Sequence, residues 1–229
     1  TNNGSFTVTY EANTGNVSRV GQITVTADGG TLQTIVTVTQ SPPAWICGQD
    51  FTDDRDNKVY STVQIGTQCW MKQNLNIGTK INGSVDQSQN STIEKYCYSD
   101  QESNCSTYGG LYQWDEMMQY STTPGLQGIC PEEWYLPTDN DWTILTTYLN
   151  SQMNYKCNGT DNYIAKVLAS TTNWNSASNT CAVGNNLASN NATGFTGLPS
   201  GCRYNNTGGS FINIGIYGIW WSSSMNTST

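Results

Sequence analysis

The sequence predicts a mixed α+β protein with short helices and long loops, preceded by a segment that is all β. Residues 1–41 alternate apolar and polar residues and contain no Cys or Trp, whereas residues 44–229 contain all eight Cys and all eight Trp. A chain of 229 residues is long enough for one or two domains with buried cores. Because a Ser-Pro-Pro run at 41–43 is typical of a stiff linker, we place strands at 1–41, a linker at 42–46 and a disulfide-rich domain at 47–229.

The first segment alternates at 5–10, 22–27 and 34–39, which predicts three strands with one apolar face each. Three strands in so short a segment leave two open edges and too little chain to cover the apolar face. Either further strands precede this sequence, or another polypeptide supplies the cover. If the sequence is the mature subunit, donation of strands between chains follows.

The clearest helix of the second segment is expected after Pro137. Thr138 is a good N-cap, Asp139 and Asp141 suit the positive end of a helix, and apolar residues recur on one face from Trp142 onward. The other elements expected are strands at 59–66, 68–71 and 211–222, a turn at 53–57, helices at 111–120 and 163–170, and a loop at 176–206.

Composition excludes several classes of function. Charged residues make up 11% of the chain, the net charge is −8, and there is no His. A nucleic-acid binder needs a basic surface, so we expect no nucleic-acid partner. The commonest general base and metal ligand is missing, and no apolar run reaches the ~18–20 residues of a membrane span. The first residues resemble neither an initiator nor a signal peptide, so the chain reads as processed or truncated.

The cysteines predict disulfides and therefore an extracellular or cell-surface location, because no CxxC pair is present, their number is even and their spacing is dispersed. The alternative is a set of free buried thiols in a cytosolic protein. Two local pairs are expected. A Cys97–Cys105 disulfide would close a short polar loop, and a Cys47–Cys69 disulfide would close the base of a predicted hairpin. The sequence leaves the pairing of the other four cysteines open, and one possible set is Cys130–Cys202 with Cys157–Cys181. The eight residues are Cys47, Cys69, Cys97, Cys105, Cys130, Cys157, Cys181 and Cys202.

Asn-x-Ser/Thr sequons mark where a glycoprotein would carry its glycans if the host attaches them. They occur at Asn16, Asn82, Asn90, Asn104, Asn158, Asn191, Asn205 and Asn226.

One run of oxygen-bearing side chains is a candidate Ca²⁺ site, since Ca²⁺ prefers hard oxygen ligands. It consists of Asp53, Asp54, Asp56 and Asn57. The alternative is a polar turn in which Arg55 pairs with a neighbouring carboxylate. We expect no other cofactor.

No catalytic arrangement is expected. The acidic residues nearest to aromatic ones lie at 132–133 and at 139 and 141, where helix-terminus electrostatics explain them better than a glycosidase pair does. Neither a nucleophile elbow nor a phosphate-binding glycine loop is present. Most Trp residues fall in motifs typical of a core, but Trp174, Tyr204 and Tyr217 are candidate contacts for a ligand or a subunit.

A series of motifs follows one order along the chain: C-G at 47–48, F-T-D at 51–53, Y-x-T-V-x-I-G-x-Q-x-W-M-x-x-N-L at 60–75, Y-G-G-L-Y-x-W at 108–114, G-I-C-P-x-x-W at 128–134, G-F-x-x-L-P-x-G at 194–201 and W-W-S-S at 220–223. This series resembles the Fibrobacter succinogenes major paralogous domain. The resemblance implies a C-type lectin-like fold with a twisted antiparallel sheet, two helices and a long loop region. Residues 1–41, ending in V-T-V-T-Q, resemble the last strands of the Bacteroidetes-associated carbohydrate-binding domain, an immunoglobulin-like sandwich.

The sequence departs from these families in three ways. Tyr135 stands where the family usually has His, and the Glu-Pro-Asn or Gln-Pro-Asp and Trp-Asn-Asp motifs of calcium-dependent sugar binding do not occur. The family also continues past W-W-S-S into closing strands, which this chain lacks.

We therefore expect a non-catalytic, secreted structural or adhesive protein of the cell surface that assembles into a homo-oligomer, filament or other polymer by strand complementation between subunits. The alternative is an extracellular module that binds glycan.

Overall fold

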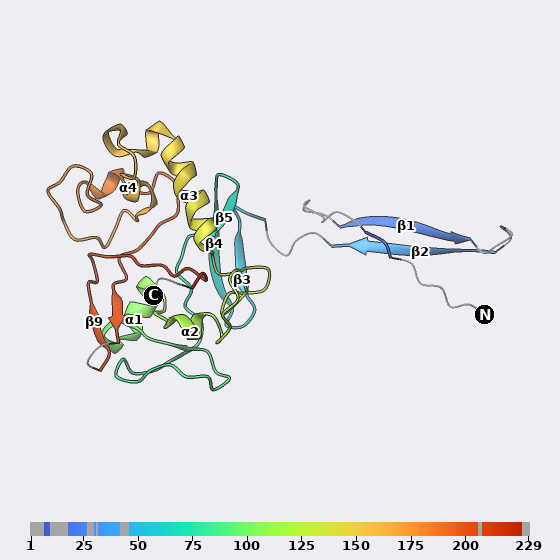
Figure 1. Cartoon of the computed structure of the whole chain (residues 1–229), viewed down its shortest axis with the longest axis horizontal. Helices are drawn as coiled ribbons and strands as arrows, with labels where there is room; N and C mark the ends of the chain where they lie inside the picture. The colour runs from blue at the N-terminus through green and yellow to red at the C-terminus, as the bar shows by residue number, and fades with distance from the viewer. Residues whose placement is uncertain are drawn as a thin grey trace.

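The computed structural model describes residues 7–9, 18–26, 30, 32–41, 46–205 and 208–225. They form a mixed α+β structure with short helices and small sheets (Figure 1). The strands are β1 (Arg19–Thr26), β2 (Gln33–Gln40), β3 (Asp50–Asp53), β4 (Lys58–Ile65), β5 (Gln68–Met71), β6 (Thr79–Lys80), β7 (Glu94–Lys95), β8 (Cys202–Tyr204) and β9 (Ser210–Ile212). The α-helices are α1 (Glu102–Tyr108), α2 (Trp114–Met117), α3 (Asp139–Ser151) and α4 (Ala165–Leu168), and single 3-10 turns lie at Tyr98–Asp100, Met153–Tyr155, Cys157–Gly159 and Leu187–Ser189.

β1 and β2 form an antiparallel hairpin in which Ile23 lies opposite Val36 and Gly21 opposite Val38. This register places Ile23, Val25, Val36 and Val38 on one face, because side chains alternate between the faces of a strand. Two of the three predicted N-terminal strands are thereby present. The third was predicted at 5–10; of that range the structure describes residues 7–9, which have no regular structure, and the rest lies outside the described residues.

The β4–β5 hairpin confirms the pair of strands predicted around a short turn. Ile65 pairs with Gln68 across the two residues Gly66 and Thr67. Gly66 has a φ of +60°, and a Cβ there would lie 3.0 Å from the ring of Tyr148 on α3. Glycine is therefore required both for the turn and for the close approach of the helix. β3 completes a three-stranded sheet in the order β3-β4-β5.

α3 begins where the sequence predicts it. The Thr138 hydroxyl accepts a hydrogen bond from the Asp141 amide at 3.2 Å, and the Asp141 carboxylate accepts one from the Thr138 amide at 2.8 Å. This capping box satisfies donors that the first turn of a helix leaves unpaired. Leu145 and Leu149 on the inner face of the helix are fully buried.

Other predicted elements are shorter than expected. The helix predicted at 111–120 is a single turn, α2, and the helix predicted at 163–170 is reduced to α4. The strand predicted at 211–222 is wrong beyond Ile212, because Asn213 and Gly215 have positive φ values of 66° and 79° that turn the chain.

Two apolar clusters form the core of residues 46–225. The first packs β4 and α3 together with a buried residue from the long C-terminal loop, and its buried members are Ile65, Leu145, Leu149, Ile164, Val167 and Phe195. The second surrounds α2, and its buried members are Ile77, Met117, Met118, Ile129, Cys130 and Leu136.

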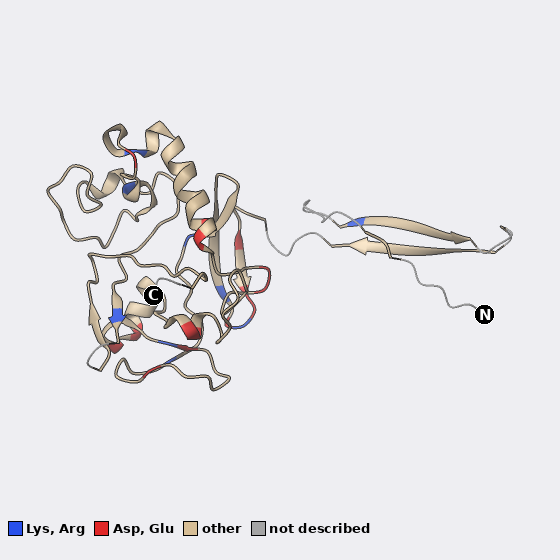
Figure 2. Cartoon of the chain, viewed as in Figure 1, with Lys and Arg blue, Asp and Glu red and all other residues tan. Residues whose placement is uncertain are grey.

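Basic side chains are sparse and most of the described ones are held in place (Figure 2). Lys95 and Lys166 are buried. Arg203 binds Asp86 at 2.8 Å with its own side chain only 4% exposed, and Lys156 binds Asp161 at 2.8 Å. None of the helices in the described ranges is long and apolar enough to cross a membrane.

Candidate functional site: an aromatic groove beside β5

A groove of about 660 Å³ lies between the two apolar clusters. Its lining includes Trp70, Trp142 and Phe195 from the side of the first cluster, and Ile129 and Leu136 from the second. A pocket of this size with mainly apolar walls is within the range that small ligands and peptide segments occupy.

Six of the eight Trp residues in the chain line this groove. They are Trp70, Trp114, Trp134, Trp142, Trp220 and Trp221. Trp70 lies 4.9 Å from Trp142, centroid to centroid, and Phe195 meets Trp70 and Trp220 edge-on at 5.9 and 5.8 Å. The walls are therefore aromatic side chains fixed by contact with one another.

The W-W-S-S motif forms one rim of the groove. The indole of Trp220 donates to Asn74 Oδ1 at 3.0 Å and that of Trp221 to the Tyr112 carbonyl at 2.8 Å. Ser223 is completely buried, where its amide donates to the Pro137 carbonyl at 2.8 Å. These bonds hold the two indoles while 38% of Trp220 and 47% of Trp221 stay exposed.

The floor of the groove follows β5, since every residue from 67 to 75 lines it and no residue of β4 does. The groove is consequently on the side of β5 that faces away from β4. The β4–β5 register pairs Val63 with Trp70, and the Lys72 amide donates to the Ser61 carbonyl at 2.9 Å. Because the backbone groups of a strand point alternately to its two sides, those of Cys69 and Met71 point away from β4.

Two polar side-chain atoms in this floor are buried without a hydrogen-bond partner within the described part of the chain. They are Gln68 Oε1 and Trp70 Nε1, one acceptor and one donor. Buried polar groups are nearly always paired in folded proteins. Both atoms are closed off from solvent, so an occupant of the groove pairs with them only after the side chains around them move.

The groove holds few groups that can perform acid–base chemistry. Asp141 takes part in the capping box and also accepts from the Tyr135 hydroxyl at 3.3 Å. Burial raises the pKa of the Cys130 thiol to about 12, and it also raises the pKa of Cys202. A thiol with a raised pKa stays protonated at neutral pH and is a poor nucleophile.

The disulfides of the structure include three of the four expected from the sequence and lack the fourth. The structure forms Cys47–Cys69, Cys97–Cys105 and Cys157–Cys181. Cys130 and Cys202 are free, so the pairing of these two is wrong. Cys130 packs inside the second cluster while Cys202 begins β8, and both thiols line the groove instead of bonding to each other.

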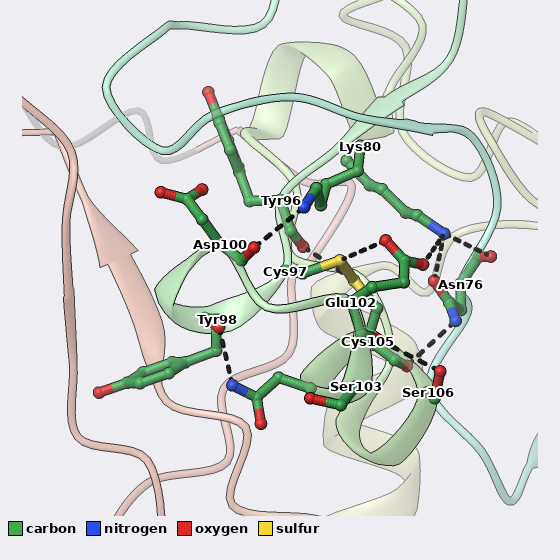
Figure 3. The surroundings of a disulfide bond; sticks show 12 residues. Asn76, Lys80, Tyr96, Cys97, Tyr98, Asp100, Glu102, Ser103, Cys105 and Ser106 are labelled. Carbon is green, nitrogen blue, oxygen red and sulfur yellow. Dashed lines mark hydrogen bonds and ion pairs between the residues drawn. A yellow bond between two sulfur atoms is a disulfide. The ribbon is translucent and has the colours of Figure 1, made fainter.

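The Cys97–Cys105 disulfide lies beside the carboxylate of Glu102 (Figure 3). These three residues are the group within the described ranges whose ligand atoms lie close enough to hold a metal ion. Because the two sulfur atoms are bonded to each other, they are not the thiolates that bind metals. The arrangement is a cross-link that fixes α1 against the preceding turn.

The candidate Ca²⁺ site is an ion-paired turn. Asp53 is buried and its carboxylate accepts from Arg55 Nε and Nη2 at 2.8 and 2.7 Å, while Asp56 binds Lys58 at 2.7 Å. The Arg55 guanidinium lowers the pKa of Asp53 by this hydrogen bonding. Asp54 is exposed and Asn57 occupies the turn with a φ of +59°. Two of the three carboxylates are thus bound by cations, which favours the turn over the calcium site.

The three aromatic residues proposed from the sequence as contacts do not line the groove. Trp174 is half-buried and its indole donates to the Gly197 carbonyl at 3.3 Å, while Tyr204 and Tyr217 are more than half exposed. Sequence reasoning took most of the Trp residues as core and named neither Trp220 nor Trp221 as a contact. The signal that could have found them is their adjacency, since neighbouring residues of an extended chain point in opposite directions and cannot both enter one core.

The sequons differ in accessibility. Asn82, Asn90, Asn158 and Asn205 are exposed, whereas Asn104 and Asn191 are half-buried. The Asn191 side chain donates to Thr196 Oγ1 at 3.1 Å and accepts from the Thr196 amide at 2.7 Å. Asn16 and Asn226 lie outside the described residues.

Comparison with known families gives two matches. Residues 63–229 match the model of the Fibrobacter succinogenes major domain, and residues 1–41 match that of a domain described as a putative binding domain, N-terminal. No curated protein and no solved structure matches the chain.

Proposed function

The chain belongs to the Fibrobacter succinogenes major domain family, and from this premise we propose that it is a non-catalytic extracellular structural or adhesive protein whose copies assemble by strand complementation. The proposal includes a C-type lectin-like fold for the second domain and an immunoglobulin-like origin for the hairpin. Three disulfides support an oxidising compartment such as the cell surface.

The observation that carries the proposal is the β1–β2 hairpin, against whose apolar face no other described helix or strand is seen to pack (Figure 1). Figure 1 shows the hairpin apart from the other elements. On the apolar face of the hairpin, Val36 is 44% exposed. On the opposite face, Ile35 is 58% exposed. An isolated two-stranded hairpin is marginally stable in water, and it needs a further strand or a packing partner. A second copy of the chain supplies such a partner at the high local density of a cell surface.

A pair of adjacent substitutions tests this proposal. Val36→Lys places a charge on the apolar face of β2, while Thr37→Lys places the same charge on the opposite face. We expect the full chain and Thr37→Lys to form oligomers or filaments in light scattering and negative-stain images, and Val36→Lys to remain monomeric. A full chain that stays monomeric at high concentration would refute the proposal.

The second candidate is a glycan-binding module, which the exposed indoles of Trp220 and Trp221 favour. Aromatic rings bind the apolar faces of sugars, and the lining of the groove also includes the amide side chain of Gln73. Binding on a glycan array that disappears in Trp221→Ala but persists in Trp174→Ala would favour this candidate. Equal signals from all three proteins would count against it.

A further inference from the structure

We infer that the groove beside β5 is the acceptor for the complementing strand, and that its occupant is β2 of a second copy of this chain. The inference rests on the proposed function, because it names the surface through which copies would assemble. It concerns strand addition to a sheet edge, in which backbone hydrogen bonds provide affinity and side-chain pockets provide specificity.

The acceptor side is an open sheet edge with its polar groups unpaired. The amides and carbonyls of Cys69 and Met71 point away from β4, and no hydrogen bond from any other described residue reaches them. Gln68 Oε1 and Trp70 Nε1 beside them are also unsatisfied within the described ranges. Such a row of alternating donors and acceptors is what an added strand pairs with.

Both strands lack the features by which proteins protect their edges. Exposed edges usually contain Lys, other charges or Pro that prevent further pairing. β5 contains Gln68, Cys69, Trp70 and Met71, and β2 contains only Gln, Thr, Ile and Val. The two strands therefore carry no charged side chain of their own and no proline, and Lys72 directly after β5 is a charged residue of the groove lining.

The apolar side chains of β2 match the walls of the groove. When β2 lies against β5 with its apolar face on the side of Trp70, Val36 and Val38 extend the row of side chains that Trp70 begins on that sheet face. This arrangement moves the exposed Val36 and the half-buried Val38 onto aromatic walls, which the hydrophobic effect favours. The sheet β3-β4-β5 then continues into β2 and β1 of the neighbouring copy.

This geometry predicts a ring or an open filament and not a two-fold symmetric dimer. The donor β2 and the acceptor β5 are different surfaces of one chain, so each copy can use both at once. Such heterologous contacts form a ring when the rotation between copies closes and an open filament when it does not.

A proline substitution tests the acceptor in the full chain. Met71→Pro removes an amide that points into the groove and leaves the β4–β5 hydrogen bonds intact, because proline is tolerated where the missing amide faces outward from an edge. Met71→Leu is the matched control. We expect Met71→Pro to raise the concentration needed for assembly by about tenfold or more, while Met71→Leu assembles like the unmodified chain and both unfold at similar temperatures.

Disulfide trapping provides a second test that does not depend on the folding of the proline variant. A Met71→Cys chain is mixed with an Ile35→Cys, a Val36→Cys or a Val20→Cys chain, with glutathione disulfide as the oxidant that takes the two electrons and two protons of the thiols. Peptide mass spectrometry then identifies the joined residues. We expect bridges from position 71 to position 35, because Met71 and Ile35 then lie on the same sheet face, and none to position 36 on β2 or to position 20 on β1.

The outcomes separate the inference from the proposed function. If the unmodified chain never assembles, both fail. If it assembles and Met71→Pro assembles equally well, or if position 71 forms no bridge to β2, the acceptor lies elsewhere and only the inference fails. Loss of assembly in Met71→Pro alone, with bridges to β2, supports both.

Discussion

At the scale of single residues, the buried Asp53 is a charged group on which the local stability of the β3–β4 turn depends. Its carboxylate accepts two hydrogen bonds from Arg55, whose Nη1 also donates to the Ile129 carbonyl at 2.9 Å. The pair thereby ties the β3–β4 turn to the second apolar cluster. Because Arg55 lowers the pKa of Asp53 below its unfolded value, the pair stabilises the fold above that unfolded value and loses this effect as pH falls through the folded pKa.

Asp53→Asn tests this contribution. We expect it to reduce the free energy of unfolding by about 1–3 kcal/mol at pH 7, because a buried hydrogen-bonded charge is lost. The difference from the unmodified protein should shrink as the pH approaches and passes the folded pKa. Urea unfolding at several pH values measures both effects, and Asp54→Asn at the neighbouring exposed position is the control. Equal losses in the two variants would contradict the prediction.

The two free thiols make a second prediction at this scale. In denaturant without reductant, we expect an alkylating reagent to modify Cys130 and Cys202 and none of the six disulfide-bonded cysteines. In the native protein, Cys202 should react first, because Cys130 is buried and its pKa is raised to about 12. Intact-mass and peptide spectrometry measure both. A mass gain other than two adducts would show a different set of disulfides.

At the scale of elements, α3 connects the sheet to the first apolar cluster through Leu145 and Leu149. We expect Leu145→Ala to cost about 2–5 kcal/mol, because it leaves a cavity in a closely packed region. Ile144→Ala, one residue away and 39% exposed in the parent protein, should cost far less. Thermal and urea unfolding of the two variants give the comparison, and similar losses would mean that this face of α3 does not pack as described.

Elements with strong local signals were predictable from the sequence. The Thr138 cap with the apolar spacing after it predicts α3, and the β4–β5 alternation around Gly66 predicts that hairpin. The parallel pair β6 and β7, by contrast, has two residues in each strand and joins Thr79 to Glu94 across a loop. A pairing this short is stabilised by the tertiary structure around it, and two residues are too few to show an alternating pattern in the sequence.

The groove was not predictable for the same reason. Its lining comes from six separated parts of the chain, at 67–75, 96, 110–117, 129–142, 195–205 and 219–221. Each part contains aromatic or aliphatic residues that are typical of a core when considered alone. Only their convergence shows that several of them border open space instead of one another.

At the scale of the whole molecule, net charge controls the approach of one copy to another. Each chain carries a formal charge of −8 at pH 7, and the sequence pI is near 4.3. We expect assembly to strengthen as the pH falls from 7 toward 4.3, because repulsion between equally charged copies decreases. Added salt at pH 7 should act in the same direction by screening that repulsion. Light scattering across a pH series and a salt series measures this, and dispersal under either condition would contradict it.

The scarcity and burial of Lys and Arg also decide which proteases can degrade the folded protein. A trypsin-like enzyme must draw a basic side chain and its flanking backbone into its active-site cleft before it can cut. Lys95, Lys166 and Arg203 are withdrawn from the surface, and Arg55 and Lys58 are held by carboxylates in a tight turn. Five of the nine basic residues are thus poorly presented, which slows attack by an enzyme of that specificity at these positions of the folded chain.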